Sequence, residues 1–92
     1  MPKSAEPLPI RQSDGSKWEV ENVPGNWIKC GTEADAKIIS NAPVVLQESY
    51  ETFLPNKTVA ARLDKTAEKL EQYNMGFHAR RFRRRAKLAR GD

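Results

Sequence analysis

The chain of 92 residues has one cysteine, one histidine and no long apolar run. Because Cys30 is the only cysteine, no disulfide can form within the chain. A zinc site built from cysteine and histidine needs about four ligands. Cys30 and His78 do not supply them, so the sequence predicts neither a metal nor another cofactor. No stretch approaches the roughly 18 apolar residues that span a bilayer, so no membrane-spanning segment is expected.

Catalytic motifs are also absent. The sequence has no Gly-x-Ser-x-Gly, no P-loop, no Gly-rich dinucleotide fingerprint and no pair of histidines. His78 is suited to general base chemistry in principle, but no nucleophile lies near it in the sequence. Paired carboxylates such as Glu33 with Asp35, and Glu48 with Glu51, are typical of helix surfaces. The sequence therefore predicts no enzymatic activity and no small-molecule substrate.

The first sixteen residues, MPKSAEPLPIRQSDGS, lack the apolar core of a signal peptide. We therefore expect the protein in the cytoplasm. This segment has three prolines and no periodic apolar pattern. It predicts a loose arm with a turn at Asp14–Gly15.

The residues that follow predict a β-hairpin from Lys17 to Cys30. In KWEVENV the apolar side chains alternate with glutamates, which is the pattern of a half-buried strand. Pro24-Gly25 suits a type II turn, because proline presets the torsion of the first central residue and glycine tolerates the positive φ of the second. A lone hairpin is barely stable, so we expect a third strand from the arm around residues 8–11.

Three helices are predicted after the hairpin. The first starts at an N-cap, Thr32, followed by acids in its first turn. The second starts at Pro43, which is favoured at the first helical position, and should bury Leu46, Tyr50, Phe53 and Leu54. The third, with Thr58 as a possible N-cap, should end near Asn74 with Gly76 as its left-handed stop.

Two features allow more than one interpretation. Trp18 and Trp27 could face each other across the hairpin, either as part of the small core or as a platform on which bases stack. We favour the core. Cys30 should be a buried structural thiol, although the nearby helix start leaves a reactive thiol open.

Basic residues are concentrated at the C-terminal end. Residues 1–76 hold nine lysines and arginines against eleven acids, a net charge of −2, whereas residues 77–92 hold seven against one, a net charge of +6. Such asymmetry indicates a polyanionic partner. Arginine in particular carries a permanent charge and a fork of donors that matches phosphate oxygens in pairs.

If this segment is helical, basic groups would cover most of its circumference, which suits a groove of nucleic acid. A helix on a membrane surface instead needs a wide apolar face. Phe77, Phe82 and Leu88 do not form one, so a membrane partner is not expected. The residues that we expect to bind the partner are Arg80, Arg81, Arg83, Arg84, Arg85, Lys87 and Arg90, together with His78 and Phe82. A solvated tail that pairs with acids of the body, and a protein-only partner, remain open as alternatives.

The run from Glu33 to Leu46, EADAKIISNAPVVL, resembles one found in many small bacteriophage and prophage proteins. Their version reads roughly acidic-Ala-Asn/Asp-Ala-Arg-Leu-Ile-Ala-x-Ala-Pro followed by leucines. Here Lys37 stands for the arginine and Ile38 for the leucine. The resemblance implies a phage origin and two helices broken at Pro43, and it implies no particular activity or site residue.

Together these features predict an α+β fold. A small antiparallel hairpin or sheet in the N-terminal half packs against two or three helices, and a basic C-terminal helix or tail follows. The expected single domain spans residues 1–76, with residues 1–16 as the loose arm and residues 77–92 as the Arg-rich extension.

The predicted function is that of a non-catalytic phage accessory protein that binds nucleic acid or a host ribonucleoprotein. An anti-defence inhibitor, for example an anti-CRISPR protein, is the favoured form. A small phage DNA-binding transcription regulator is the alternative, and a protein-only interaction module with a solvated basic tail is the second alternative.

Overall fold

A computed structural model describes residues 5–13, 15 and 17–91, and it confirms the α+β fold. Its strands are β1 (Ile10–Ser13), β2 (Lys17–Val23) and β3 (Asn26–Cys30), and they form one antiparallel sheet in the order β1-β2-β3. The helices are α1 (Glu33–Ser40), α2 (Ala42–Glu51), α3 (Lys57–Gln72) and α4 (Gly76–Arg90).

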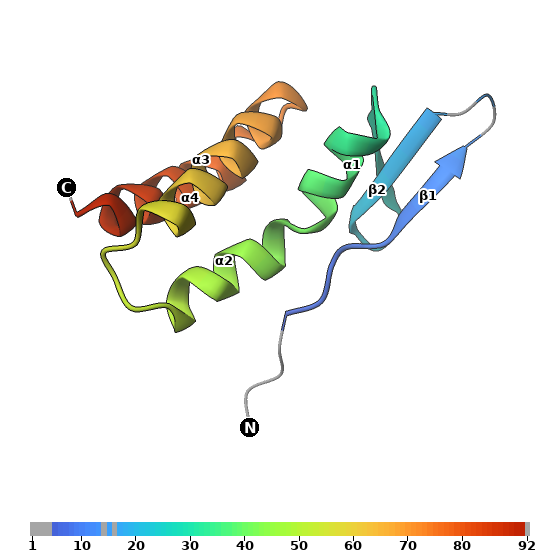
Figure 1. Ribbon diagram of the computed structural model, residues 1–92. Coiled ribbons are helices and arrows are strands. Elements are labelled where there is room, and N and C mark those ends of the chain that lie inside the picture. Colours follow the sequence, from blue (N-terminus) through green and yellow to red (C-terminus); the bar gives the residue numbers. More distant parts are fainter. Residues whose placement is uncertain (1–4, 14, 16, 92) are drawn as a thin grey trace.

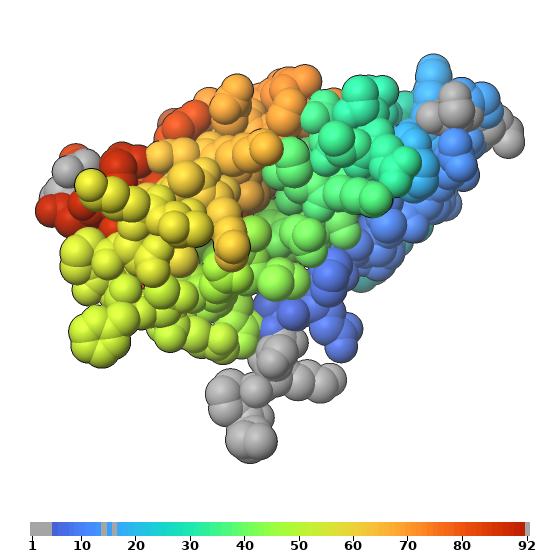
Figure 2. Space-filling model, viewed as in Figure 1, coloured from blue at the N-terminus to red at the C-terminus, as the bar shows by residue number. Residues whose placement is uncertain are grey.

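The molecule is elongated, with the sheet at one end and the paired helices α3 and α4 at the other (Figure 1). Helices α1 and α2 lie between these ends. Seen from the same side, their side chains fill the space between the sheet and the helix pair (Figure 2). None of the helices in the described part of the chain is both long enough and apolar enough to cross a membrane.

The predicted hairpin is confirmed as β2 and β3, with Gly25 at a φ of 85° in the turn. Trp18 pairs with Cys30, and Trp27 pairs with Glu21, which lies on the opposite face of β2. The expectation that the two tryptophans face each other is therefore wrong. Trp18 packs against the core beside fully buried Val20, whereas Trp27 is half-buried on the other face.

The expected third strand is present as β1, slightly later in the chain than predicted. Leu8, before the strand, is fixed to the end of α1: its N–H donates to the Ser40 carbonyl at 2.8 Å, and its carbonyl accepts from the Ser40 hydroxyl at 2.6 Å. The described part of the arm is thus joined to the body. The turn expected at Asp14–Gly15 includes Asp14, which lies outside the described residues.

The junction between α1 and α2 forms as predicted. The Thr32 hydroxyl accepts a hydrogen bond from the Asp35 N–H at 3.1 Å, which caps α1. Pro43 lies in the first turn of α2. This junction buries Ala36, Ile39 and Ala42 beneath the sheet and the helix pair.

The predicted buried face of α2 is only half right. Leu46 and Leu54 pack against the core, but Tyr50 is 55% exposed and Phe53 is 95% exposed. The helix ends at Glu51, and Thr52 is already extended. The helical spacing that grouped Phe53 with Leu46 therefore stops applying two residues before Phe53.

Both predicted ends of α3 need correction. The N-cap is Asn56, whose side-chain oxygen accepts from the Val59 N–H at 3.0 Å, and not Thr58. At the other end, Asn74 takes the left-handed conformation with a φ of 63°, and the Met75 N–H donates to the Leu70 carbonyl at 2.7 Å. This Schellman motif lets Gly76 begin α4 instead of ending α3.

Candidate functional site

Helix α4 lies antiparallel to α3 and is joined to it by the turn at residues 73–75. One stripe of α4 is buried, and its members are Ala79, Phe82, Ala86 and Ala89. Facing them on α3 are buried residues that include Leu63, Ala67 and Leu70. Phe82 is only 5% exposed, so it is a core residue and is not available to a partner as the sequence suggested.

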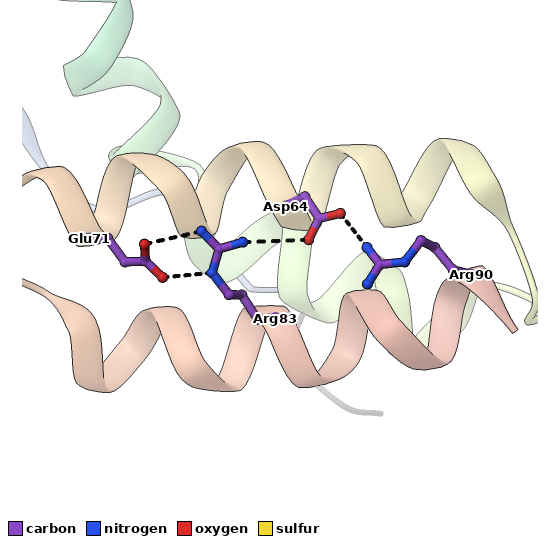
Figure 3. Close-up of polar contacts among 4 residues, drawn as sticks. All are labelled: Asp64, Glu71, Arg83 and Arg90. Carbon is purple, nitrogen blue, oxygen red and sulfur yellow. Dashed lines mark hydrogen bonds and ion pairs between the residues drawn. The ribbon is translucent and has the colours of Figure 1, made fainter. Parts of the chain in front are cut away.

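Two of the predicted binding arginines instead hold α4 to α3 (Figure 3). Arg83 makes two hydrogen bonds to the Glu71 carboxylate, Nε to Oε1 at 2.6 Å and Nη2 to Oε2 at 3.1 Å. Arg83 also lies 4.0 Å from Asp64, which pairs with Arg90. The hydrogen bond from Arg83 lowers the pKa of Glu71, because it stabilises the ionised carboxylate.

A third arginine joins α4 to the end of α2. Arg85 Nη2 donates to the Ser49 carbonyl at 2.8 Å, and its Nε donates to the Ser49 hydroxyl at 3.2 Å. The guanidinium carbon also lies 4.5 Å from the centre of the Tyr50 ring. A cation at a carbonyl in the last turn of a helix is favourable, because the helix dipole is negative there. Arg85 is therefore largely a structural residue.

The remaining cations lie on the surface of α4 opposite its buried stripe, which we call the outer face. It is formed by Arg80, Arg81, Arg84 and Lys87. All four side chains are exposed, and none forms an ion pair or a hydrogen bond with another described residue. Two exposed apolar side chains, Phe77 at 85% and Leu88 at 51%, lie among them on the helical projection.

At one side the outer face borders a shallow hollow of ≈ 210 Å³. It is lined by Tyr50, Arg81, Arg84, Arg85 and Leu88. Clefts that bury a drug-sized ligand hold about 300–1,000 Å³. The hollow is thus suited to one flat or small anionic group at the surface rather than to an enclosed metabolite.

His78 is exposed and lies apart from the outer face. The Phe77 and His78 rings are nearly perpendicular, at 86°, with their centres 5.9 Å apart. His78 and Arg81 border a second, more apolar hollow of ≈ 220 Å³ between the arm, α2 and α4, with Leu8, Leu46 and Met75 among its other lining residues.

One carboxylate expected on a helix surface is buried instead. Asp35 is 9% exposed, and it accepts a hydrogen bond from the Tyr73 hydroxyl at 2.6 Å and pairs with Lys69 Nζ at 2.8 Å. Hydrogen bonds from Lys69 and then Tyr73 lower the pKa of Asp35. The Tyr73 oxygen also accepts from the Gly31 N–H at 2.9 Å, so this cluster joins the sheet and α1 to α3.

Cys30 is buried, as expected for a structural thiol. Burial, and then the negative charge of Asp35, raise its pKa. Since the thiolate is the nucleophile, the structure does not favour a reactive cysteine. Within the described ranges, no group of three or more His, Cys, Asp or Glu side chains is arranged to hold a metal ion.

The predicted binding residues thus include side chains that hold the fold together and cations that are exposed on the outer face. The sequence did not reveal the acids that take up Arg83 and Arg90, nor the contact of Arg85 with Ser49 and Tyr50. Asp64 and Glu71 are seven residues apart, a spacing that places both on one side of α3 and that could have been noticed. The contact between α4 and α2 spans 36 positions of sequence and leaves no local signal.

Searches against models of protein families, curated protein sequences and solved structures found no match. The phage-like run of residues 33–46 forms α1 and the first half of α2, where it supplies buried core residues. Nothing in the comparisons bears on that resemblance, so it stays a prediction.

Proposed function

We propose that the protein is a non-catalytic binder of nucleic acid, free or within a ribonucleoprotein, and that the outer face of α4 contacts its phosphates. The observation that carries this proposal is the division of the basic residues. Arg83, Arg85 and Arg90 have partners within the fold, whereas the outer face collects the C-terminal cations that have none among the described residues.

Unpaired cations on one rigid helix favour a polyanion because binding releases the counterions condensed on nucleic acid. If the tail served only to pair with acids of the body, most of its cations would have partners within the fold. Only some of the cations in this segment do. A protein partner would be expected to need a larger apolar centre, because interface cores are depleted of charge. The outer face has only Phe77 and Leu88 to offer as apolar groups.

The test compares two variants that lose the same charge from different surfaces. In the first, Arg80, Arg81, Arg84 and Lys87 are changed to glutamine. In the control, four exposed lysines outside α4 are changed to glutamine, namely Lys17, Lys29, Lys57 and Lys65. Each variant brings the formal net charge from +4 to zero, so net charge alone cannot distinguish them.

Binding to a fluorescent oligonucleotide is measured by anisotropy between about 50 and 200 mM salt. The wild type should show a slope of log K against log salt of about −3 to −4 for four phosphate contacts. The outer-face variant should lose most of its affinity and most of this slope, whereas the control should retain both. Equal losses in the two variants, or no binding by the wild type at low salt, would refute the proposal.

We further propose that the biological target is a nucleic-acid machine of bacterial defence in the host cytoplasm, for example a CRISPR ribonucleoprotein. The phage-like run supports a phage origin, and the basic face suits a ribonucleoprotein surface. Occupancy of such a face would block the target stoichiometrically. A titration of the target's activity with added protein should therefore show a sharp break near one to a few equivalents.

A transcription regulator is the alternative, and two measurements separate it from an inhibitor. Capture from a bacterial lysate, with and without nuclease, should retain a protein complex after nuclease treatment if the target is a ribonucleoprotein. A regulator would instead bind specific duplex sites as a dimer, with half-sites about one helical turn apart. A palindromic footprint would favour the regulator over the inhibitor.

A further inference from the structure

The hollow beside the outer face combines an aromatic ring with arginines. Tyr50 comes from the last turn of α2, and Arg81 and Arg84 come from α4. Tyr50 is 55% exposed, whereas Ser49, the residue before it in α2, is fully buried. An exposed aromatic ring beside unpaired arginines is the combination by which proteins hold unpaired nucleotides.

Arg85 fixes the position of this ring. Its guanidinium lies 4.5 Å from the ring centre while it donates two hydrogen bonds to Ser49, the residue before Tyr50. Tyr50 is thus held between its own helix and α4, and less rotational freedom has to be lost when a ligand stacks on it. Phe53, by contrast, is 95% exposed, follows the end of α2 and does not line the hollow.

We propose that this hollow is a nucleotide subsite that makes the protein prefer single-stranded nucleic acid. One unpaired base stacks on the side of the Tyr50 ring that Arg85 does not cover, and the adjoining phosphates contact Arg81 and Arg84. The inference rests on the proposed function and adds to it the class of nucleic acid. In a duplex the bases are stacked on each other, so a duplex offers only its phosphates to the outer face.

The test uses three probes of the same length: a single strand, the matching duplex, and a single strand that is abasic throughout its centre. Wild-type protein, Tyr50→Leu, Tyr50→Phe and the control Phe53→Leu are compared by anisotropy at one salt concentration. Stacking of one base on an aromatic ring is worth about 5- to 150-fold in affinity by alanine substitution. We therefore expect Tyr50→Leu to weaken single-strand binding by at least about fivefold.

The remaining variants and probes isolate the contribution of the base. Tyr50→Phe should retain the affinity of the wild type, because the ring is kept. Phe53→Leu should leave binding unchanged. Binding of the duplex and of the abasic strand should not respond to Tyr50→Leu, because neither presents a free base to the ring.

Two sets of results would overturn the subsite. The first is an equal affinity for the single strand and the duplex, with no effect of Tyr50→Leu on either. The second is a loss of single-strand affinity in Phe53→Leu that equals the loss in Tyr50→Leu, or a loss in Tyr50→Leu that is as large on the abasic strand as on the intact strand. Neither set of results contradicts the proposed function as long as the outer-face glutamine variant still loses affinity for the probes. Circular dichroism of each variant is the control for folding.

Discussion

Two phenylalanines on α4 should respond in opposite ways to the same substitution. Phe82 is 5% exposed and lies in the stripe that packs on α3, whereas Phe77 is 85% exposed. Alanine at a buried phenylalanine typically costs about 3–5 kcal/mol, because apolar transfer is lost and a cavity remains. We expect a cost of that size for Phe82→Ala and almost none for Phe77→Ala.

That cost would be a large share of the total stability. Small domains unfold with about 0.05–0.15 kcal/mol per residue, which gives roughly 5–14 kcal/mol for a chain of 92 residues. A loss of about 3 kcal/mol should lower the melting temperature by about 12–24 °C in a domain of this size. Both variants make the same chemical change on one helix, so their difference reports burial and not helix propensity.

Urea denaturation followed by circular dichroism and by tryptophan fluorescence is the assay. Both tryptophans lie in the sheet, far along the chain from α4. If the chain unfolds as one cooperative unit, the two signals give one transition, and Phe82→Ala shifts both. If Phe82→Ala melts like Phe77→Ala, or shifts only the helical signal, then α4 is an independent extension and our description of its packing is wrong.

Three further predictions follow from the contacts of single residues. Arg83→Ala should lower the melting temperature and retain most nucleic-acid affinity, whereas Arg84→Ala should leave the melt unchanged and reduce the salt slope by about 1. Hydrogen bonds lower the folded-state pKa of Asp35, so its stabilising contribution is present above about pH 4 and is lost as the pH falls through that pKa. Asp35→Asn should therefore flatten the acid side of a plot of stability against pH. Cys30 should react with a thiol reagent at pH 8 much more slowly in the folded protein than in urea, because burial raises its pKa.

Features that depend on neighbouring residues could be predicted from the sequence. Thr32 as an N-cap, the turn at Pro24-Gly25 and the restart of the helix at Pro43 are each determined by backbone chemistry within a few positions. The end of α3 shows the limit of such reasoning. Asn74 and Gly76 both tolerate a positive φ, and the choice falls on Asn74 because it places Met75 against Leu70 in the core.

Features that depend on distant contacts were harder to predict. Tyr50 shares a helical spacing with Leu46, and nothing nearby in the sequence reports that Arg85 lies against its ring. Asp35 has the pattern of an exposed acid in a first helical turn. It is buried because Lys69 and Tyr73, more than thirty residues away, supply its hydrogen-bond partners.

The spacing of the buried residues in α3 and α4 nevertheless indicates which arginines lie beside the fold and which face solvent. The buried residues of α4 follow a spacing of three, four and three, at positions 79, 82, 86 and 89. Those of α3 include positions 59, 63, 66 and 70, which have the complementary spacing. Such repeats mark the contact seam of two helices that pack side by side.

Once the seam is recognised, each basic residue of α4 has a definite place in a seven-residue repeat. Arg83 and Arg85 flank the seam, where charged side chains reach across to the neighbouring helices. The outer-face residues Arg80, Arg81, Arg84 and Lys87 fall at positions that point away from the seam. A count of charge alone treats all of these cations as equally available to a partner. The alanines and the phenylalanine between them decide which cations hold the fold together and which face solvent, so the apolar residues of a basic segment carry the information about its binding surface.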